Sequence, residues 1–255
     1  MQNDQLIGLS RQMVMERQFD VIANNLANIN TTGFKSSRSL FQEFLTGDAR
    51  DNTFRGGDSQ VHFVADGGAF YNFGQGPIQR TGNPLDIAID GDSFIAVTTP
   101  NGERYTRNGA LQINANGQLV TNTGVPVAGD GGGPITFQPT DRSISISADG
   151  RITALDGPTN VEALRGKLKI VSFAQPNQLR SEGGNMFSAL NGVTGQRPAR
   201  INIMQGAIEG SNVNGVLEMT RMVEVNRTYA MIAATMKTQD DMHRNTIDKL
   251  AAVPN

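Results

Sequence analysis

Residues 85–121 read LDIAIDGDSFIAVTTPNGERYTRNGALQINANGQLVT, and this stretch decides the fold of the middle of the chain. Apolar and polar residues alternate along it, as they do in half-buried β-strands. Among the Asn-Gly and Asp-Gly pairs of this region, those at 101–102, 116–117 and 149–150 lie between such runs. These pairs favour hairpins, because type I′ turns need positive φ at both central residues. The pattern predicts an antiparallel, largely β domain over residues 85–208.

The two ends of the chain follow a different period. From about Asp4 to Ile29, one apolar stripe has the heptad spacing 4, 3, 4, 3: Met15, Phe19, Ile22, Leu26 and Ile29. From about Val213 to Ala251, a second has the spacing 3, 4, 3, 4: Met222, Val225, Tyr229, Ile232 and Met236. Such spacing is typical of helices that pair along a narrow seam. Gly33 is the expected stop of the first helix, and Asn212 or Asn214 the expected cap of the second.

We therefore predict an α+β fold, with long N- and C-terminal helices pairing as a coiled-coil-like helical domain and a β domain inserted between them. The predicted boundaries are 1–45 with 209–255 for the helical domain, 46–84 for an extended linker, and 85–208 for the β domain. The linker prediction rests on a polar, Gly-rich stretch at 46–57 and on Gly and Pro residues from 74 to 84. The alternative is two independent helices that dock on the β domain.

Composition excludes several classes of protein. The chain has 255 residues, a net charge of −2 and no cysteine, so disulfides and thiolate metal sites are excluded and nucleic acid is not an expected partner. The sequence contains no run of 18 apolar residues, which a membrane-spanning helix would need. The first residues lack the basic and apolar regions of a secretory signal, so we expect a cytoplasmic protein or one that leaves by a route that ignores such signals.

Several motifs resemble those of one known family. Residues 23–35 read ANNLANINTTGFK, residues 82–97 read GNPLDIAIDGDSFIAV, and residues 105–109 read YTRNG. Residues 209–213 read EGSNV and are followed by Glu218-Met219. In this order the motifs resemble those of the bacterial flagellar rod and hook proteins, over nearly the whole chain. The stretches GGPIT at 132–136 and ISISADG at 144–150 resemble the proximal rod subfamily, with the distal rod and other axial proteins as alternatives. An acidic residue common in the family is replaced by Ala230.

The resemblance implies that the motifs make contacts between subunits. The candidates are motif residues and positions on the last helix: Asn24, Asn25, Leu26, Asn28, Gly33, Phe34, Lys35, Ser211, Asn212, Glu218, Met219, Arg227 and Tyr229. From the residues alone, the asparagines could equally form a solvated helix face, because i, i+3 and i+4 positions share a side. Phe34 could equally be an ordinary core residue. We expect Asn25→Leu to impair assembly more than folding of the monomer.

We find no catalytic, cofactor-binding or metal-binding motif in the sequence. The two histidines, His62 and His243, have no neighbouring second ligand. Residues 129–134 (GDGGGP) lack the last glycine of a dinucleotide loop, and Phe94 occupies a ligand position of the calcium-loop pattern that starts at Asp90. We expect a non-enzymatic structural protein without cofactors. The rival classes are a β-rich surface-binding module, which the absence of tryptophan disfavours, and a hydrolase with scattered carboxylates.

The resemblance also implies a location and partners. The chain is expected to form part of the periplasmic rod of the flagellar basal body, as a drive-shaft component that polymerises through its terminal helices. Its partners would be copies of itself, other proximal and distal rod subunits, and the flagellar type III export apparatus, which needs no cleavable signal peptide. Neither nucleic acid nor direct membrane insertion is expected.

Overall fold

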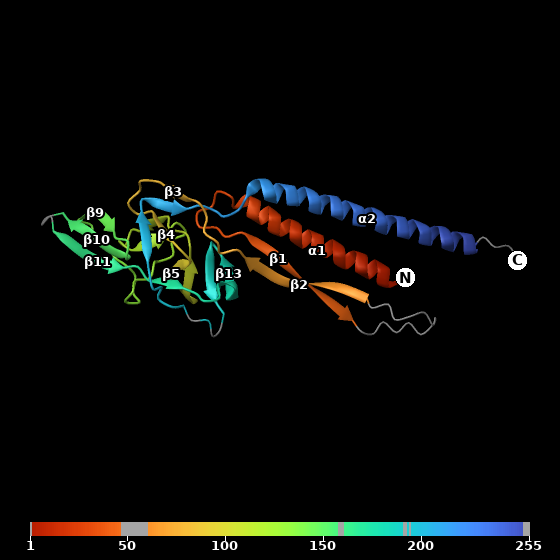
Figure 1. Cartoon of the computed structure of the whole chain (residues 1–255), viewed down its shortest axis with the longest axis horizontal. Coiled ribbons are helices and arrows are strands. Elements are labelled where there is room, and N and C mark those ends of the chain that lie inside the picture. Colours follow the sequence, from red (N-terminus) through yellow and green to blue (C-terminus); the bar gives the residue numbers. More distant parts are fainter. Residues whose placement is uncertain (1, 47–60, 158–160, 191–192, 194, 252–255) are drawn as a thin grey trace. The chain divides into compact units, whose positions relative to one another are not determined.

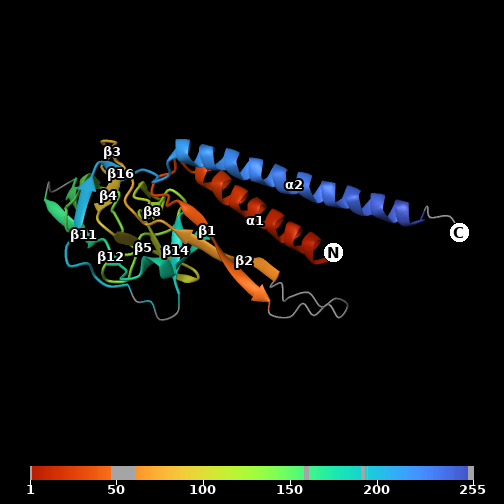
Figure 2. The same ribbon diagram turned by 45° about the vertical axis from the view of Figure 1, so that its right-hand side comes forward.

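The computed structural model describes residues 2–46, 61–157, 161–190, 193 and 195–251. The chain forms two compact units (Figures 1 and 2). Unit 1 comprises residues 1–26, 37–70 and 214–255, and unit 2 comprises residues 27–36 and 71–213. The chain therefore passes from one unit to the other four times.

Unit 1 contains the two α-helices of the described residues and one two-stranded sheet, whereas a single 3-10 turn, η1 (Pro176–Gln178), lies in unit 2. The elements of unit 1 are α1 (Gln2–Ala27), β1 (Ser37–Thr46), β2 (Val61–Tyr71) and α2 (Gly215–Ala251). In both views, α1 and α2 lie side by side (Figures 1 and 2). Asn214 caps α2, since its side-chain Oδ1 accepts a hydrogen bond from the backbone N–H of Leu217 at 3.2 Å. Neither helix is long and apolar enough, within the described residues, to cross a bilayer.

The predicted coiled-coil pairing of the terminal helices is wrong. Of the residues in the N-terminal seam only Ile22 is buried, while Phe19 on α1 and Tyr229 on α2 keep 38% and 45% of their surface exposed. Ile29 lies beyond the end of α1. The physical reason is the narrowness of the seams: polar residues such as Gln18 and Arg221 stand beside the apolar ones and line an open groove between the helices. Close knob-into-hole packing needs a continuous apolar stripe.

The described part of unit 2 holds fourteen strands in several small sheets. These are β3 (Ile78–Arg80), β4 (Ile87–Asp90), β5 (Ser93–Thr99), β6 (Gly102–Thr106), β7 (Leu111–Ile113), β8 (Leu119–Thr121), β9 (Asp141–Ile146), β10 (Arg151–Asp156), β11 (Glu162–Lys167), β12 (Ile170–Ser172), β13 (Leu179–Gly183), β14 (Met186–Ala189), β15 (Asn202–Gln205) and β16 (Ala207–Glu209). The largest sheet has the order β12-β5-β6-β14-β13, and a second has the order β11-β10-β9.

The three predicted hairpins are present. β5 pairs with β6, β7 with β8 and β9 with β10, all antiparallel. The glycines at 102, 117 and 150 all have positive φ, but Asn101, Asn116 and Asp149 do not, so the hairpins form without the type I′ turns that the pairs suggested. Short pairs also join the end of the β region to its beginning: β15 pairs with β4, and β16 with β3. The last strands before α2 are therefore built into the sheets that open unit 2.

The core of unit 2 has two parts. One is aliphatic and centres on fully buried residues such as Val97, Leu119 and Ile152. The other is aromatic and gathers four buried phenylalanines: Phe73, Phe94, Phe173 and Phe187. Phe94 packs edge-on against the other three, with ring centroids 5.5–6.3 Å apart.

The compact units do not follow the predicted boundaries. The stretch 46–84 contains β2 and β3, and Phe73 within it belongs to the core of unit 2. The motif residues 27–36 also belong to unit 2, and of these only Ala27 lies in a helix. The polar stretch 46–57 lies, from residue 47 on, outside the described residues.

Candidate functional site: a buried ion cluster at the meeting point of the motifs

Three charged side chains meet inside unit 2. The Lys35 ammonium donates to Oε1 of Glu209 at 2.6 Å, and the Arg107 guanidinium donates through Nη1 to Oε2 of the same carboxylate at 3.2 Å. All three side chains are at most 1% exposed. The three residues are far apart in the sequence, and each comes from a different motif: TTGFK, YTRNG and EGSNV. We call Lys35, Arg107 and Glu209 the ion cluster.

Backbone groups bind further polar atoms of the ion cluster, although the buried Arg107 Nε has no hydrogen-bond partner among the described residues. Lys35 Nζ also donates to the carbonyl of Gly74 at 2.8 Å, and Glu209 Oε1 accepts from the amide of Gly76 at 2.8 Å. Arg107 Nη2 donates to the carbonyl of Gly91 at 2.6 Å. Buried charges are tolerated when such bonds satisfy them. The cluster thus ties β16 to the segment that follows α1 and to the loops before β3 and β5.

The ion cluster contains two cations and one carboxylate. Burial lowers the pKa of the Lys35 ammonium, and the neighbouring Glu209 opposes part of that shift. Burial also lowers the pKa of Arg107, with Glu209 and then Asp92 opposing it. The guanidinium lies over the Phe94 ring, 5.0 Å from its centroid, in a cation–π contact. Among the described residues, Glu209 is therefore the carboxylate in direct contact with both buried positive charges.

Glycines allow the chain to approach the ion cluster closely. Gly33 has φ +68°, and a Cβ there would come within 2.6 Å of the backbone of Arg107 and Asn108. A Cβ on Gly76 would come within 2.2 Å of the carbonyl oxygen of Gly210. The N–H of Gly33 donates to the backbone carbonyl of Glu209 at 2.8 Å. The glycine of the TTGFK motif is thus required by backbone packing in unit 2. The prediction that Gly33 stops the first helix is wrong, because α1 already ends at Ala27.

A second polar centre, Asn212, lies three residues after Glu209. Its Oδ1 accepts from the amide of Ser36 at 2.7 Å, and its Nδ2 donates to the carbonyls of Asn72 and Gly74 at 2.7 and 2.9 Å. One amide thus joins three segments of unit 2. Asn212 does not cap α2, which leaves that role to Asn214.

In unit 1, Asn25 has an equivalent position at the end of α1. Its side chain is 1% exposed. Oδ1 accepts from the amide of Ser37 at 2.9 Å, while Nδ2 donates to the Ser37 carbonyl at 2.8 Å and approaches Glu218 Oε2 at 3.4 Å. The amide therefore continues the hydrogen-bonding pattern of a strand with the first residue of β1, and it also contacts the first turn of α2.

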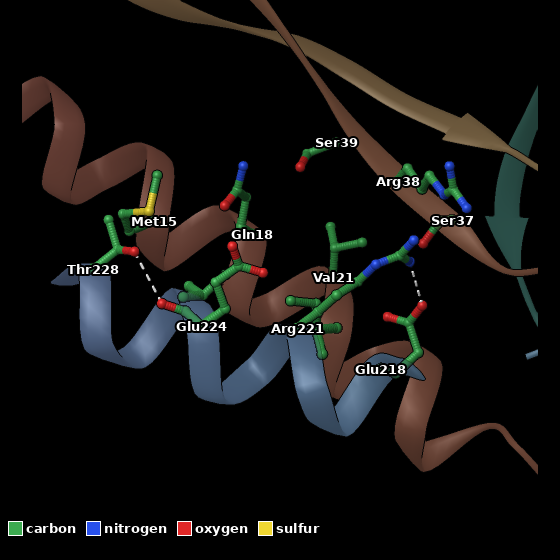
Figure 3. A pocket seen from close by; sticks show the side chains of 12 residues that line it. Met15, Gln18, Val21, Ser37, Arg38, Ser39, Glu218, Arg221, Glu224 and Thr228 are labelled. Carbon is green, nitrogen blue, oxygen red and sulfur yellow. Dashed lines mark hydrogen bonds and ion pairs between the residues drawn. The ribbon is translucent and has the colours of Figure 1, made fainter. Parts of the chain in front are cut away.

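An open groove in unit 1 lies beside Asn25 and is bordered by α1, β1 and α2. Its volume is about 430 Å³, and it is lined by charged and apolar side chains together. Figure 3 shows Arg221 reaching back to Glu218, an ion pair of 2.7 Å, with Gln18 and Met15 on the opposite helix. No titratable group of the groove has the paired acid and base geometry of a hydrolase in the described residues, so we assign no chemistry to it.

The predicted contact residues fall into two groups. Buried in the chain are Asn25, Gly33, Phe34, Lys35, Ser211 and Glu218, and exposed are Asn24, Met219, Arg227 and Tyr229. Leu26, Asn28 and Asn212 are half-buried. Phe34 is buried within the chain, which agrees with the alternative that it is an ordinary core residue. The role of all thirteen in subunit contacts stays a prediction, and the buried ones also have the intramolecular bonds described above.

Several members of these clusters were not predicted from the sequence. Arg107 belongs to the YTRNG motif but was not a predicted site residue, and neither were its neighbours in these clusters, Ser37, Gly74 and Gly76. The only signal for Arg107 was the presence of a charged residue between a predicted strand and an Asn-Gly pair. Its burial at 3% exposure could not be inferred without the fold.

Asn25→Leu is expected to lower the free energy of unfolding of the purified chain by about 1–3 kcal/mol, because it leaves the buried amide of Ser37 without its acceptor. Denaturant unfolding of the monomer measures this loss. Asn24→Leu, at the exposed neighbouring position, is the matched control and should change stability much less. This expectation replaces the one drawn from the sequence, and equal stability of Asn25→Leu and the unaltered chain would contradict it.

Comparison with known proteins agrees with the motifs. Three family models match: a flagella basal body rod protein model at residues 6–35, a flagellar hook protein FlgE/F/G D1 domain model at 88–154, and a flagellar basal body rod FlgEFG C-terminal model at 204–249. The chain belongs to the family of flagellar basal-body rod and hook proteins, and it is a structural subunit of the rod.

Relatives that match over nearly their full length are rod proteins. The flagellar basal-body rod protein FlgF of Caulobacter vibrioides is 36% identical over 99% of this chain and 100% of the relative. FlgF of Mesorhizobium japonicum is 34% identical over 93% of both chains. The rod protein FlgG of Bacillus subtilis is 30% identical over 94% of this chain and 96% of the relative. The expected resemblance to the FlgF rod protein is confirmed, and a distal-rod assignment fits less well.

Proposed function

We propose that the chain is a non-enzymatic subunit of the proximal rod that assembles through the outer faces of its terminal helices. Its partners would be copies of itself and other rod proteins. The observation that carries this proposal is the exposure of large apolar side chains on α2 away from α1. Val216, Met219 and Val223 follow i, i+3, i+7 spacing and are 78%, 56% and 52% exposed. Such a stripe marks an interaction surface more often than a solvated face.

The outer face of α1 offers a matching surface. Leu9 and Met13 are exposed, and the same line continues through the carboxylates of Glu16 and Asp20. On α2 the apolar stripe continues through the exposed cation Arg227. An α2 face of one subunit could therefore place apolar residues on apolar residues, and Arg227 near a carboxylate, on α1 of the next. Contacts of this head-to-tail kind extend without closing into a ring.

We also propose the location and the route that the family resemblance implies. The rod would lie in the periplasm, and the chain would reach it unfolded or partly folded through the flagellar type III export apparatus. Two-stranded sheets and narrowly seamed helices, as in unit 1, are marginally stable alone. A unit of this kind fits a chain that is exported before it completes its packing on neighbours.

The double variant Met219→Glu, Val223→Glu is expected to fold normally and to fail to enter the rod. Both positions are exposed, so monomer stability should change by no more than about 0.5 kcal/mol each. Carboxylates on the apolar stripe would oppose a subunit contact there. The measurement is the amount of the chain in isolated basal bodies, together with motility. Asn101→Glu, in the exposed β5–β6 turn, is the control and should assemble. Normal incorporation of the double variant would refute the assigned face.

A further inference from the structure

The segments that lead out of unit 2 are held together by a small set of bonds. The chain enters unit 2 at residue 27, leaves after Ser36, returns at Tyr71 and leaves again after Val213. Three of these ends carry Ser36, Asn72 and Asn212. The amide of Asn72 donates to the carbonyl of Ser36 at 2.9 Å, and the amide of Asn212 to the carbonyl of Phe34 at 3.4 Å.

The Asn212 side chain adds three bonds to the same ends. It accepts from Ser36 and donates to Asn72 and Gly74, as described above. Every one of these three ends is therefore bonded to another, either through backbone groups or through this one amide. None of these three ends can be pulled out of unit 2 without breaking bonds to another of them.

The ion cluster involves residues next to these bonds in the sequence. Lys35 precedes Ser36, and Glu209 lies three residues before Asn212, so the ion pair joins the first exit of the chain to the last. The Gly76 amide and the Gly74 carbonyl fix the same pair to the segment that returns at Tyr71. Because these charges are buried, solvent and salt screen them far less than a surface pair. Pulling Lys35 away from Glu209 would also leave buried charges without a partner.

We propose that Asn212 and the ion cluster form a mechanical clamp, a site that bears force between the terminal segments and the β-rich unit 2. Force that enters through residues 27–36 and 207–213 loads the Asn212 bonds and the Lys35–Glu209 pair together and not one after another. Bonds that are loaded together share the applied force. The clamp should therefore resist a force that would break the bonds of a strand pulled off one bond at a time from its end. The relevance of this strength rests on the proposed role in a rod that carries load.

Single-molecule pulling on the full-length chain, with handles at its two ends, tests the clamp. The ends lead directly into the loaded segments, so unit 2 should open in one step at high force. Asn212→Ala should lower that rupture force by about one third, because it removes three of about ten hydrogen bonds that join residues 33–36, 72–77 and 209–212, and these bonds have similar strength. Glu209→Gln should lower it at least as far. If Glu209→Gln does not fold, Asn212→Ala alone decides the result.

The matched control separates force bearing from general stability. Ile152→Ala removes a fully buried side chain in β10, which belongs to the β9–β11 sheet and not to the clamp. It should lower the thermal midpoint at least as much as Asn212→Ala and leave the rupture force unchanged. An unaltered rupture force in Asn212→Ala, or an equal drop in Ile152→Ala, would overturn the clamp.

A cellular measurement separates failure of the clamp from failure of the proposed function. In cells that lack the natural copy, the unaltered chain should restore swimming at every viscosity, and a chain that restores none would count against the rod proposal. The Asn212→Ala chain should restore swimming in dilute medium and lose it at a lower viscosity than the unaltered chain. Equal performance at high viscosity would contradict the clamp while leaving the rod role intact.

Discussion

Glu209→Gln is expected to lower the free energy of unfolding of unit 2 by about 3–5 kcal/mol, the usual cost of removing one partner from a buried ion pair. The substitution keeps the shape of the side chain but removes the charge that balances Lys35 and Arg107. Two buried cations would then face each other without a counter-ion in contact. Denaturant unfolding of the purified full-length chain measures the effect, as a lower midpoint with an unchanged slope.

The control for this prediction is another ion pair of unit 2. Lys169 and Glu103 lie 2.6 Å apart, but both side chains are about one third exposed. Glu103→Gln should therefore change stability by no more than about 1 kcal/mol, as is typical of pairs in contact with water. A loss in Glu209→Gln no larger than that in Glu103→Gln would show that the ion cluster contributes no more than a surface pair.

Phe94→Ala is expected to destabilise unit 2 by about 3–5 kcal/mol, the range for large aromatic residues in cores. Phe94 is 1% exposed and touches three other phenylalanines of the aromatic core. Alanine would leave a cavity at the centre of this group and would also remove the ring under Arg107. The loss should therefore appear both in thermal unfolding and in faster hydrogen exchange at Gly76, whose amide binds Glu209.

Phe94→Leu is the matched variant for this position. Leucine refills much of the cavity, so the loss of stability should be clearly smaller than in Phe94→Ala, while the cation–π contact is absent from both. If the two variants are equally stable, filling of the cavity is not what makes Phe94 important. If exchange at Gly76 is unchanged in both, the aromatic core does not support the ion cluster.

Local signals in the sequence predicted the local structure well. The Asn-Gly and Asp-Gly pairs predicted three hairpins, and each is formed by consecutive strands that need no distant partner. The spacing of apolar residues predicted two terminal helices, and Asn214 caps the second. These features depend on a few neighbouring residues, which is why a single sequence reveals them.

The pairing of the helices could not be predicted from the same signal. A heptad stripe says which residues of a helix face a partner, but not how wide the apolar strip must be to exclude water. Gln18 and Arg221 lie beside the stripes and keep the groove between α1 and α2 open. The apolar stripe on the opposite face of α2 was likewise not predicted. Its residues lie outside the heptad spacing that Met222 and Val225 follow.

The ion cluster was out of reach for a different reason. Lys35 and Glu209 are 174 residues apart, and nothing in their local sequence indicates that they meet. The motifs did mark the regions, since TTGFK, YTRNG and EGSNV each supply one member. Their meaning, though, was read as contact between subunits, whereas within this chain the charged members are buried and bind one another. Only the paired strands β3 and β16, which bring the end of the β region back to its beginning, reveal this.

The most direct test of the account is the reactivity of one thiol before and after assembly. The chain contains no cysteine, so Met219→Cys introduces a single thiol on the exposed face of α2, and Val223→Cys provides a second site for an independent measurement. The purified monomer should react fully with a maleimide. In basal bodies isolated from cells that make either variant, the thiol should be protected and should react again once the rod is dissociated. Reaction in intact rods at the rate of the monomer would contradict assembly through this face.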